Sequence, residues 1–322
     1  MPVVLQFPGA QSVHQPAGPH ALLIDRLGHL LYWTAAVVFV LVVAALLWAA
    51  FHRRRPEESS RYPARERRMT IAVATASAAT IAVLFLCTLA TYATGRELTA
   101  PPGGKPLQIR VTGHQWWWSV EYRDSIPIDW VTTANEIHLP VGRPAVFELS
   151  TQDVNHSFWL PDLGPKRDLI AGQETSIWYR ADSAGIYRGQ CAEFCGYQHA
   201  KMALTLVAEP PDSFAAWLTR QRQAASPPTD SVARRGLEVF LGSTCVTCHT
   251  ITGTPAGGRV GPDLTHLASR RTIAAGTLPN TRGNLAGWIL DPQGIKPGAK
   301  MPPTRLAPAD LQALLTYLET LR

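Results

Sequence analysis

Two long runs of apolar residues stand near the start of the chain. They cover residues 29–51 (HLLYWTAAVVFVLVVAALLWAAF) and residues 69–93 (MTIAVATASAATIAVLFLCTLATYA), and neither contains an Asp, Glu, Lys or Arg. Each run is longer than the roughly 20 residues with which a helix crosses a hydrocarbon core of about 30 Å. Because both runs lack a polar face, the alternative of two buried helices in a soluble protein is disfavoured. The pattern predicts a hairpin of two transmembrane helices within residues 1–100.

The segment between these runs, residues 52–68, contains seven arginines. Short loops rich in Lys and Arg stay in the cytoplasm, so both ends of the hairpin are expected on the periplasmic or outer side of a bacterial inner membrane. The same segment explains much of the net charge of +6, so no nucleic-acid partner is inferred from the basic composition. The first run follows no charged n-region and precedes no small-residue cleavage site, which favours a retained anchor over a removed signal peptide.

A different pattern covers residues 101–211, where short runs such as PLQIRVTG, TANEIHLP and PAVFELSTQ alternate apolar and polar residues. Gly, Pro, Asn and Asp separate these runs, as is typical of an antiparallel sandwich or barrel. We therefore predict an all-β domain here. A short amphipathic helix is expected over residues 212–224, and the whole segment 212–230 is assigned as a linker that ends in AASPPTD.

The last part of the chain, residues 231–322, has helical patterns joined by loops rich in Gly and Pro. These patterns cover residues 231–241, 283–290 and 308–321. They predict a small all-α domain.

The five cysteines of the chain are distributed unevenly. Four form two close pairs, Cys191 with Cys195 and Cys245 with Cys248, whereas Cys87 stands alone in the second apolar run. Pairs at such short spacing favour cofactor attachment over a disulfide framework.

The first pair lies in GQCAEFCGYQHAKM, residues 189–202. Cys191, Cys195, His199 and Met202 are soft or borderline donors, which suit copper. A strained disulfide or a zinc site with three protein ligands is the alternative, but neither uses the methionine. His156, in DVNHSFWLPDLG, is the best candidate for a second imidazole. One bound thiolate would give a mononuclear copper centre, whereas two thiolates permit a binuclear one.

The second pair lies in STCVTCHT, in which Cys245, Cys248 and His249 form the CxxCH attachment motif of c-type haem. A redox dithiol or a chance match is the alternative. Two later segments, GPDLTHL (261–267) and GWILDPQGIKPGAKMPP (287–303), resemble the loop beside the haem and the distal segment of small cytochromes c. This resemblance makes Met301 the second axial ligand of the iron, and His/Met ligation suits an electron carrier.

Two residues near these segments have an alternative assignment. His266 could compete with Met301 as the iron ligand. Trp288 could donate a hydrogen bond to a haem propionate or simply belong to the core.

The segments GQCAEFCGYQHAKM, NHSFWLPDLGPKRD and GHQWWWSVEY, placed after two apolar helices, resemble subunit II of haem-copper cytochrome c oxidases over about residues 11–210. The resemblance implies a cupredoxin-like Greek-key barrel that holds a binuclear copper centre, CuA. It also implies that electrons enter through Trp116, at the surface over the copper. Matching positions give the copper ligands as His156, Cys191, the main-chain carbonyl of Glu193, Cys195, His199 and Met202. The side chain of Glu193 would point towards a magnesium site shared with subunit I.

With a class I cytochrome c domain at residues 231–322, the whole resembles a caa-type subunit II. Electrons would then pass from a donor, such as a cytochrome c or an upstream respiratory complex, through haem c and CuA to the dioxygen-reducing site of subunit I. The resemblance further implies a proton-translocating complex that also contains subunit III. A tether gives the fused haem domain a high effective concentration at the copper domain. Opposite net charges, about +5 for residues 231–322 and about −3 for residues 101–210, would favour docking of the two domains.

Some positions depart from the family pattern or carry a plainer interpretation. Glu66 stands before the second apolar run without the Trp, Thr and Pro that accompany a proton-feeding glutamate in the family, which puts that role in doubt. Trp117 and Trp118 could be structural, with alternate rings buried in the β core. Asp153, three residues before His156, is interpreted as a loop residue rather than a docking residue.

Three other protein classes share part of this pattern. A CuA-containing subunit of a nitric oxide reductase is the nearest, and a membrane-tethered electron shuttle is another. Nitrous oxide reductase also has a CuA domain, but it needs a large histidine-rich catalytic domain that this sequence lacks.

Overall fold

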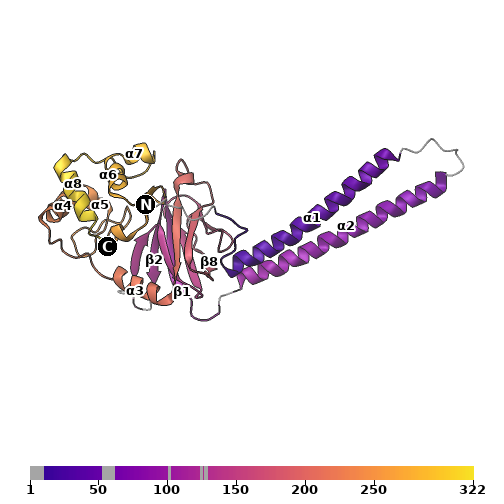
Figure 1. Cartoon of the computed structure of the whole chain (residues 1–322), viewed down its shortest axis with the longest axis horizontal. Coiled ribbons are helices and arrows are strands. Elements are labelled where there is room, and N and C mark those ends of the chain that lie inside the picture. Colours follow the sequence, from indigo (N-terminus) through magenta and orange to yellow (C-terminus); the bar gives the residue numbers. More distant parts are fainter. Residues whose placement is uncertain (1–10, 53–61, 101–102, 124–125, 127–129) are drawn as a thin grey trace, which may run out of the picture. The chain divides into compact units, whose positions relative to one another are not determined.

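The computed structural model describes residues 11–52, 62–100, 103–123, 126 and 130–322. Two apolar helices, a β domain and a helical domain follow one another along the chain, as the sequence predicts (Figure 1). The chain forms two compact units: residues 22–101 make one, and residues 1–21 together with 102–322 make the other.

The two apolar helices are longer than the runs that predict them. α1 covers Pro19–Phe51 and α2 covers Tyr62–Thr99, and both are long and apolar enough to cross a membrane. Several threonine hydroxyl groups bond within the helix; for example, Thr34 donates to the carbonyl of Leu30 and Thr88 to that of Leu84. Such internal hydrogen bonds suit a lipid environment, which offers no water to a polar group.

Ten strands form the β domain in two five-stranded sheets, ordered β3-β2-β1-β5-β8 and β4-β10-β9-β6-β7. The β1–β5 and β4–β10 pairs are parallel and the other ladders are antiparallel. The strands are β1 Leu107–His114, β2 Trp117–Arg123, β3 Val131–Ala134, β4 Glu136–Pro140, β5 Ala145–Thr151, β6 His156–Trp159, β7 Arg167–Leu169, β8 Thr175–Tyr179, β9 Gly185–Cys191 and β10 Ala203–Glu209.

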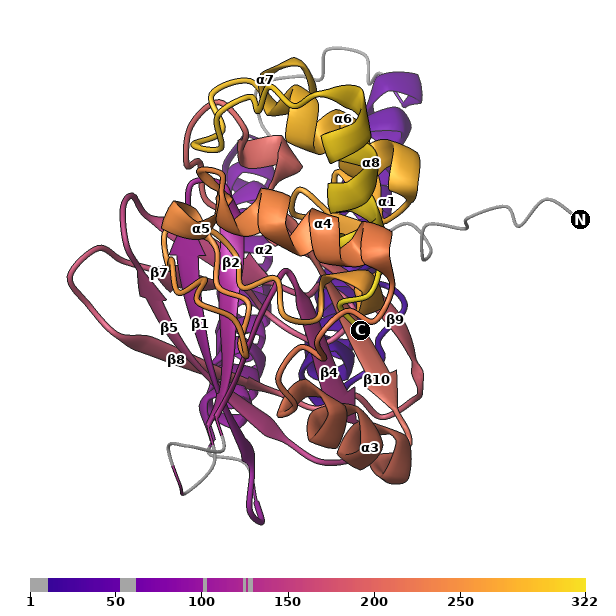
Figure 2. The same cartoon turned by 90° about the vertical axis from the view of Figure 1, so that its left-hand side faces the viewer.

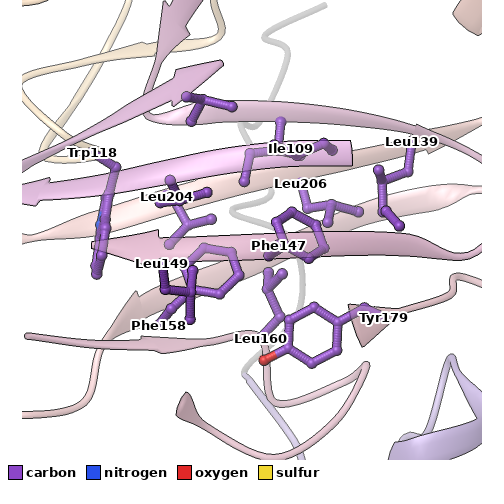
Figure 3. Packing of buried hydrophobic residues seen from close by; sticks show 14 of the residues in the cluster. Ile109, Trp118, Leu139, Phe147, Leu149, Phe158, Leu160, Tyr179, Leu204 and Leu206 are labelled. Carbon is purple, nitrogen blue, oxygen red and sulfur yellow. The ribbon is translucent and has the colours of Figure 1, made fainter. Parts of the chain in front are cut away.

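Alternating side chains of these strands fill the space between the sheets. β1 and β5 bury every second residue, as the alternating sequence pattern requires of a sheet with one inner face. Phe147, Phe158 and Tyr179 pack against one another at ring-centroid distances of 5.3–6.0 Å (Figure 3). Cys191, Cys195 and Met202 belong to the same core, but most of its members lie outside the metal-binding segment.

Segments at both ends of the β sequence complete the β domain. Before α1, the backbone amide of Ala17 donates to the carbonyl of Asp162, and the amide of Asp182 donates to the carbonyl of Ala17. After β10, helix α3 (Pro211–Gln221) places Trp217 against Tyr122 and stacks it on His138. The amphipathic helix predicted over 212–224 is therefore present, and it belongs to the β domain rather than to a free linker.

Short helices and loops make up the C-terminal domain. α4 and α8 pack closely, because a Cβ on Gly236 of α4 would clash with the backbone of Ala313 in α8. Figure 2 shows α4, α6 and α8 as neighbouring helices. The elements are α4 Ser231–Leu241, α5 Cys245–Cys248, the 3₁₀ turn η4 Leu267–Ser269, β11 Thr272–Ile273, β12 Leu278–Pro279, α6 Arg282–Leu290, α7 Pro292–Ile295 and α8 Pro308–Leu318.

Candidate metal and haem sites

The residues that the sequence proposes as copper ligands come from two strands, β6 and β9, and from the connection that follows β9. His156 begins β6 and Cys191 ends β9, and these strands pair so that Phe158 stands opposite Cys191. Cys195 and Met202 lie in the connection from β9 to β10, as does His199 at the start of the 3₁₀ turn η3 (His199–Lys201). The sheet therefore gathers residues that are up to 46 positions apart, from 156 to 202.

Each cysteine sulfur has its own histidine. The Sγ of Cys191 lies 3.8 Å from Nδ1 of His156, and the Sγ of Cys195 lies 3.6 Å from Nδ1 of His199. The two sulfurs are 3.7 Å apart, which is far longer than the roughly 2.05 Å of a disulfide. A weaker donor completes each half: the carbonyl oxygen of Glu193 is 3.2 Å from Cys191 Sγ, and Met202 Sδ is 3.8 Å from Cys195 Sγ.

Most of this donor set is buried, and His199 is partly exposed. His156 is fully buried, and Cys191, Cys195 and Met202 are each less than 5% exposed. The contact between the two thiols lowers the pKa of Cys191 and raises that of Cys195, so the pair readily holds one thiolate. Burial lowers the pKa of His156, but its contacts with Cys191 and Asp153 outweigh this effect and raise it. Soft sulfur and imidazole donors in a mostly buried pocket fit copper.

Asp153 lies in the loop between β5 and β6, as predicted, but its carboxylate also contacts a proposed copper ligand and the C-terminal domain. Its Oδ1 lies 2.9 Å from Nε2 of His156, so the carboxylate holds the ring on the side away from the sulfur. Its Oδ2 accepts hydrogen bonds from the amide of Gln115 and, at 3.2 Å, from Nζ of Lys300 in the C-terminal domain. Burial raises the pKa of Asp153, but these partners lower it overall. The spacing of three residues from His156 was the only sequence signal for this position.

The three tryptophans of GHQWWWS have three different environments. Trp118 is fully buried between the sheets, with its ring edge towards His156 and Phe158. Trp117 is half-buried and stacks on His114 at 4.2 Å. The structural interpretation is thus correct for Trp118.

Trp116 links the donor cluster to the C-terminal domain. Its indole Nε1 donates to the carbonyl of Cys195 at 2.9 Å. On the other side, a Cβ on Gly298 would lie 3.4 Å from the same ring, so the two domains touch there. Trp116 is only 7% exposed for this reason, whereas the sequence placed it at the surface.

The segment from Cys191 to Tyr197, called the cysteine loop, has three residues that point outwards. Glu193 turns its carbonyl towards Cys191 but leaves its side chain exposed. Beside it, Phe194 and Tyr197 are 76% and 93% exposed. Exposing two aromatic rings to water is unfavourable in free energy, which favours a contact surface at this loop.

A cavity in the C-terminal domain collects the residues proposed to hold haem. Cys245 and Cys248, from α5, line it together with His249 and Met301. The remaining lining is largely apolar and includes core residues of the domain, among them Phe240, Leu285, Ile289, Leu314 and Leu318. A large, flat and mostly apolar group fits such a lining.

His249 is oriented as an iron ligand requires. Its Nδ1 lies 2.7 Å from the carbonyl oxygen of Pro262, so Nδ1 carries the proton and Nε2 keeps its lone pair. A Cβ on Gly261 would lie 2.7 Å from the imidazole, which explains the glycine of GPDLTHL. Burial lowers the pKa of His249, which also keeps the ring neutral.

His266 is held elsewhere. Its Nδ1 is 2.7 Å from the carbonyl oxygen of Arg322, and its Nε2 is 3.1 Å from that of Gln223. Both ring nitrogens are therefore occupied by backbone, and His266 does not line the cavity. Trp288 does line it and also packs against the core, so it keeps both of its assignments.

Comparison with known proteins matches both domains separately. Residues 127–209 match the family of cytochrome c oxidase subunit II periplasmic domains, and residues 233–322 match the cytochrome c family. The chain carries a subunit II periplasmic domain fused to a cytochrome c domain. The resemblance drawn from the sequence motifs, including the caa-type order of domains, is confirmed.

Curated relatives agree with this assignment. Cytochrome c oxidase subunit 2 of Alkalihalophilus pseudofirmus is 39% identical over 221 residues, which cover 68% of this chain and 63% of that protein. Subunit 2 of Bacillus sp. strain PS3 is 34% identical over 66% of this chain and 62% of its own length. The chain thus spans somewhat less than two thirds of the length of these two relatives. The periplasmic domain of subunit II from Bradyrhizobium japonicum is 30% identical over 37% of this chain and 96% of that structure, with a TM-score of 0.35.

Proposed function

We propose that this chain is the electron-entry subunit of a respiratory, proton-translocating cytochrome c oxidase. Electrons would pass from a donor through a covalent haem c and a binuclear CuA centre to the dioxygen-reducing site of subunit I. The arrangement of the two sulfurs, each with its own histidine, is the single observation that carries the proposal. A mononuclear centre would use one thiol only, and Cys195 would then have no role beside His199 and Met202.

The proposed copper ligands are those of the sequence assignment. They are His156, Cys191, the carbonyl of Glu193, Cys195, His199 and Met202. A copper centre held by these residues would supply one-electron transfer. The protein contributes the mostly buried pocket and, through Asp153 and the strand framework, a fixed orientation of His156.

The proposed haem ligands are Cys245 and Cys248 for covalent attachment, with His249 and Met301 on the iron. Gln293 supports the methionine segment, because its side-chain amide donates to the carbonyls of Ala299 and Met301. The Pro262 carbonyl supports the histidine. His/Met ligation gives a c-type haem a potential suited to electron transfer.

Trp116 is proposed as the entry point to copper. It bonds the carbonyl of Cys195 on one side and touches Gly298, three residues before Met301, on the other. A short path through packed groups then joins the two proposed sites.

The exposed cysteine loop is proposed to face subunit I. Phe194 and Tyr197 supply apolar contact area, and the Glu193 carboxylate between the loop and its partner could bind an interface magnesium. Subunit III and a cytochrome c or upstream respiratory complex are the other proposed partners. The proposed location is a bacterial inner membrane, with both domains on the periplasmic or outer side.

Copper stoichiometry and electron paramagnetic resonance of the purified full chain test the proposal. Two coppers per chain are expected, with the seven-line hyperfine pattern of a spin shared over two copper nuclei. Cys195→Ser is the matched control. It leaves one cysteine thiol and should give a four-line spectrum. One copper and four lines in the unaltered chain would refute the binuclear assignment.

A further inference from the structure

Lys296 of the haem domain is almost completely buried against the copper domain. Its side chain is part of a residue only 3% exposed, and its Nζ lies within hydrogen-bond distance of three carbonyl oxygens. Two belong to the copper domain, Trp116 at 2.7 Å and Lys201 at 2.7 Å. The third, Ala274 at 3.1 Å, belongs to the haem domain. An ammonium group has three N–H donors, so all of them are used.

These three partners are carbonyl groups and not carboxylates. Among the residues that the structure describes, no Asp or Glu oxygen forms an ion pair with Lys296. A buried ammonium whose hydrogen-bond partners are all neutral is tolerated only when every donor is paired. A shift of the haem domain by a few ångströms would leave at least two donors unpaired in a dry contact. The lysine therefore favours one relative position of the two domains. It contributes less to the strength of their association.

The turn beneath Lys296 is itself unusual. Ala274 and Ala275 have φ values of 53° and 57°, a region that alanine rarely adopts. The Ala274 carbonyl accepts from Lys296, and the Ala275 carbonyl accepts from the amide of Ala203 in β10. Both strained residues thus point their carbonyls at groups that fix the interface. Backbone outliers that persist at such a contact indicate that the surrounding structure holds them in place.

A reciprocal contact surrounds the buried lysine. Lys201 of the copper domain donates to the carbonyl of Ile295 at 2.6 Å, and Gln198 donates to the carbonyl of Pro297 at 2.7 Å. Two side chains of the segment 198–201 thus hold the backbone of residues 295–297 by hydrogen bonds. This segment directly follows the cysteine loop. By contrast, Lys300 has a side chain that is 61% exposed and reaches Asp153 at the rim of the contact.

We propose that Lys296 is a positioning residue that locks the haem domain onto the copper domain in a single register, with the haem cavity against Trp116. The inference rests on the proposed function in so far as Trp116 is the entry point to copper. The fused haem domain then acts as a fixed donor rather than a swinging one. Because the locked domain covers Trp116, a soluble donor protein is excluded from that surface and must deliver its electron to the haem domain.

Amide hydrogen exchange in the full-length protein tests the lock without any electron transfer. The amides of Ala203 and Arg271 report it, since they donate across the contact to Ala275 and to Glu136. Lys296→Met keeps the apolar stem and removes the ammonium, and Lys300→Met is the matched control. We expect exchange of the two amides to rise about tenfold or more in Lys296→Met and to change less than about twofold in Lys300→Met. Equal exchange in Lys296→Met and the unaltered protein would overturn the proposal.

A spectroscopic signature separates positioning from a general loss of stability. Pulsed dipolar spectroscopy between the copper centre and the ferric haem should give one narrow distance distribution in the unaltered protein and a broad one in Lys296→Met, with both optical spectra unchanged. A narrow distribution in both proteins would overturn the lock. If Lys296→Met lowers haem content, Lys296→Gln serves in the same two measurements, with exchange expected to rise. The exchange measurement needs no copper, so it tests the role of Lys296 even if the copper assignment is wrong. The two proposals can therefore be refuted separately.

Discussion

The copper and haem domains prepare their sites in opposite ways. In the β domain, Cys191, Cys195 and Met202 are a small part of a large core, in which Trp118, Phe147 and Phe158 are fully buried. In the haem domain, the core surrounds the cavity: Phe240, Leu314 and Leu318 belong to the core and line the cavity directly. A site that takes up a small part of a core can be lost without loss of the fold, whereas a cavity that the core surrounds cannot.

The largest effect that tests this contrast comes from removing each prosthetic group. Replacing Cys245 and Cys248 by serine should prevent haem attachment and abolish the cooperative thermal unfolding of the haem domain, because its apolar lining loses its main contact. Replacing Cys191 and Cys195 by serine should abolish copper binding but leave the β domain folded. Scanning calorimetry and near-ultraviolet circular dichroism on the full chain provide the measurement. A cooperative transition of the haem domain that survives without haem would contradict the contrast.

A smaller but specific effect is expected at the point where the two domains meet. Trp116→Ala should strongly slow electron transfer from haem to copper and leave both metal spectra intact, since no proposed ligand is lost. Flash-photolysis kinetics measure the rate. Trp117→Ala is the matched control, because that ring stacks on His114 instead and should leave the rate nearly unchanged. An unaffected rate in Trp116→Ala would mean that electrons enter elsewhere.

The smallest effect is expected at the rim of the contact. The Lys300–Asp153 ion pair is partly exposed, so its loss should cost at most about 0.4 kcal/mol of docking free energy. Asp153→Asn also removes a negative charge beside His156, which should raise the midpoint potential of the copper centre. Lys300→Met should lower that potential instead, because it removes the positive charge that pairs with the Asp153 carboxylate. Redox titration of the two variants gives the sign, and shifts in the same direction would contradict this role of Asp153.

The sequence predicted the parts of the chain that depend on local pattern and short motifs. The apolar runs, the alternating strands, the helix at 231–241 and the gathering of Cys191, Cys195, His199 and Met202 all follow from spacing along the chain. His156 could be named as the best candidate for a second imidazole, but its spacing does not place it beside the cysteines, because only strand pairing brings β6 next to β9.

Contacts between domains were not predictable in the same way. Nothing in the spacing of Asp153 indicates that a lysine 147 positions later approaches it. In the sequence, Lys296 resembles any other basic residue of a polar loop. Its burial arises only in the folded protein, where three separate segments meet around it. The exposure predicted for Trp116 was wrong for the same reason, since the fused domain covers it.

The hydrogen bonds of Ala17 with Asp162 and Asp182 bear on how the protein is assembled. Residues before α1 and residues after α2 share one folded body, so the chain must cross the bilayer an even number of times, whatever the charges of the intervening loop. The segment before α1 therefore has to wait, already translocated, until both helices and most of the β strands have followed it. Folding of the β domain cannot strictly follow the order of synthesis, because a part of the chain that precedes both helices closes it.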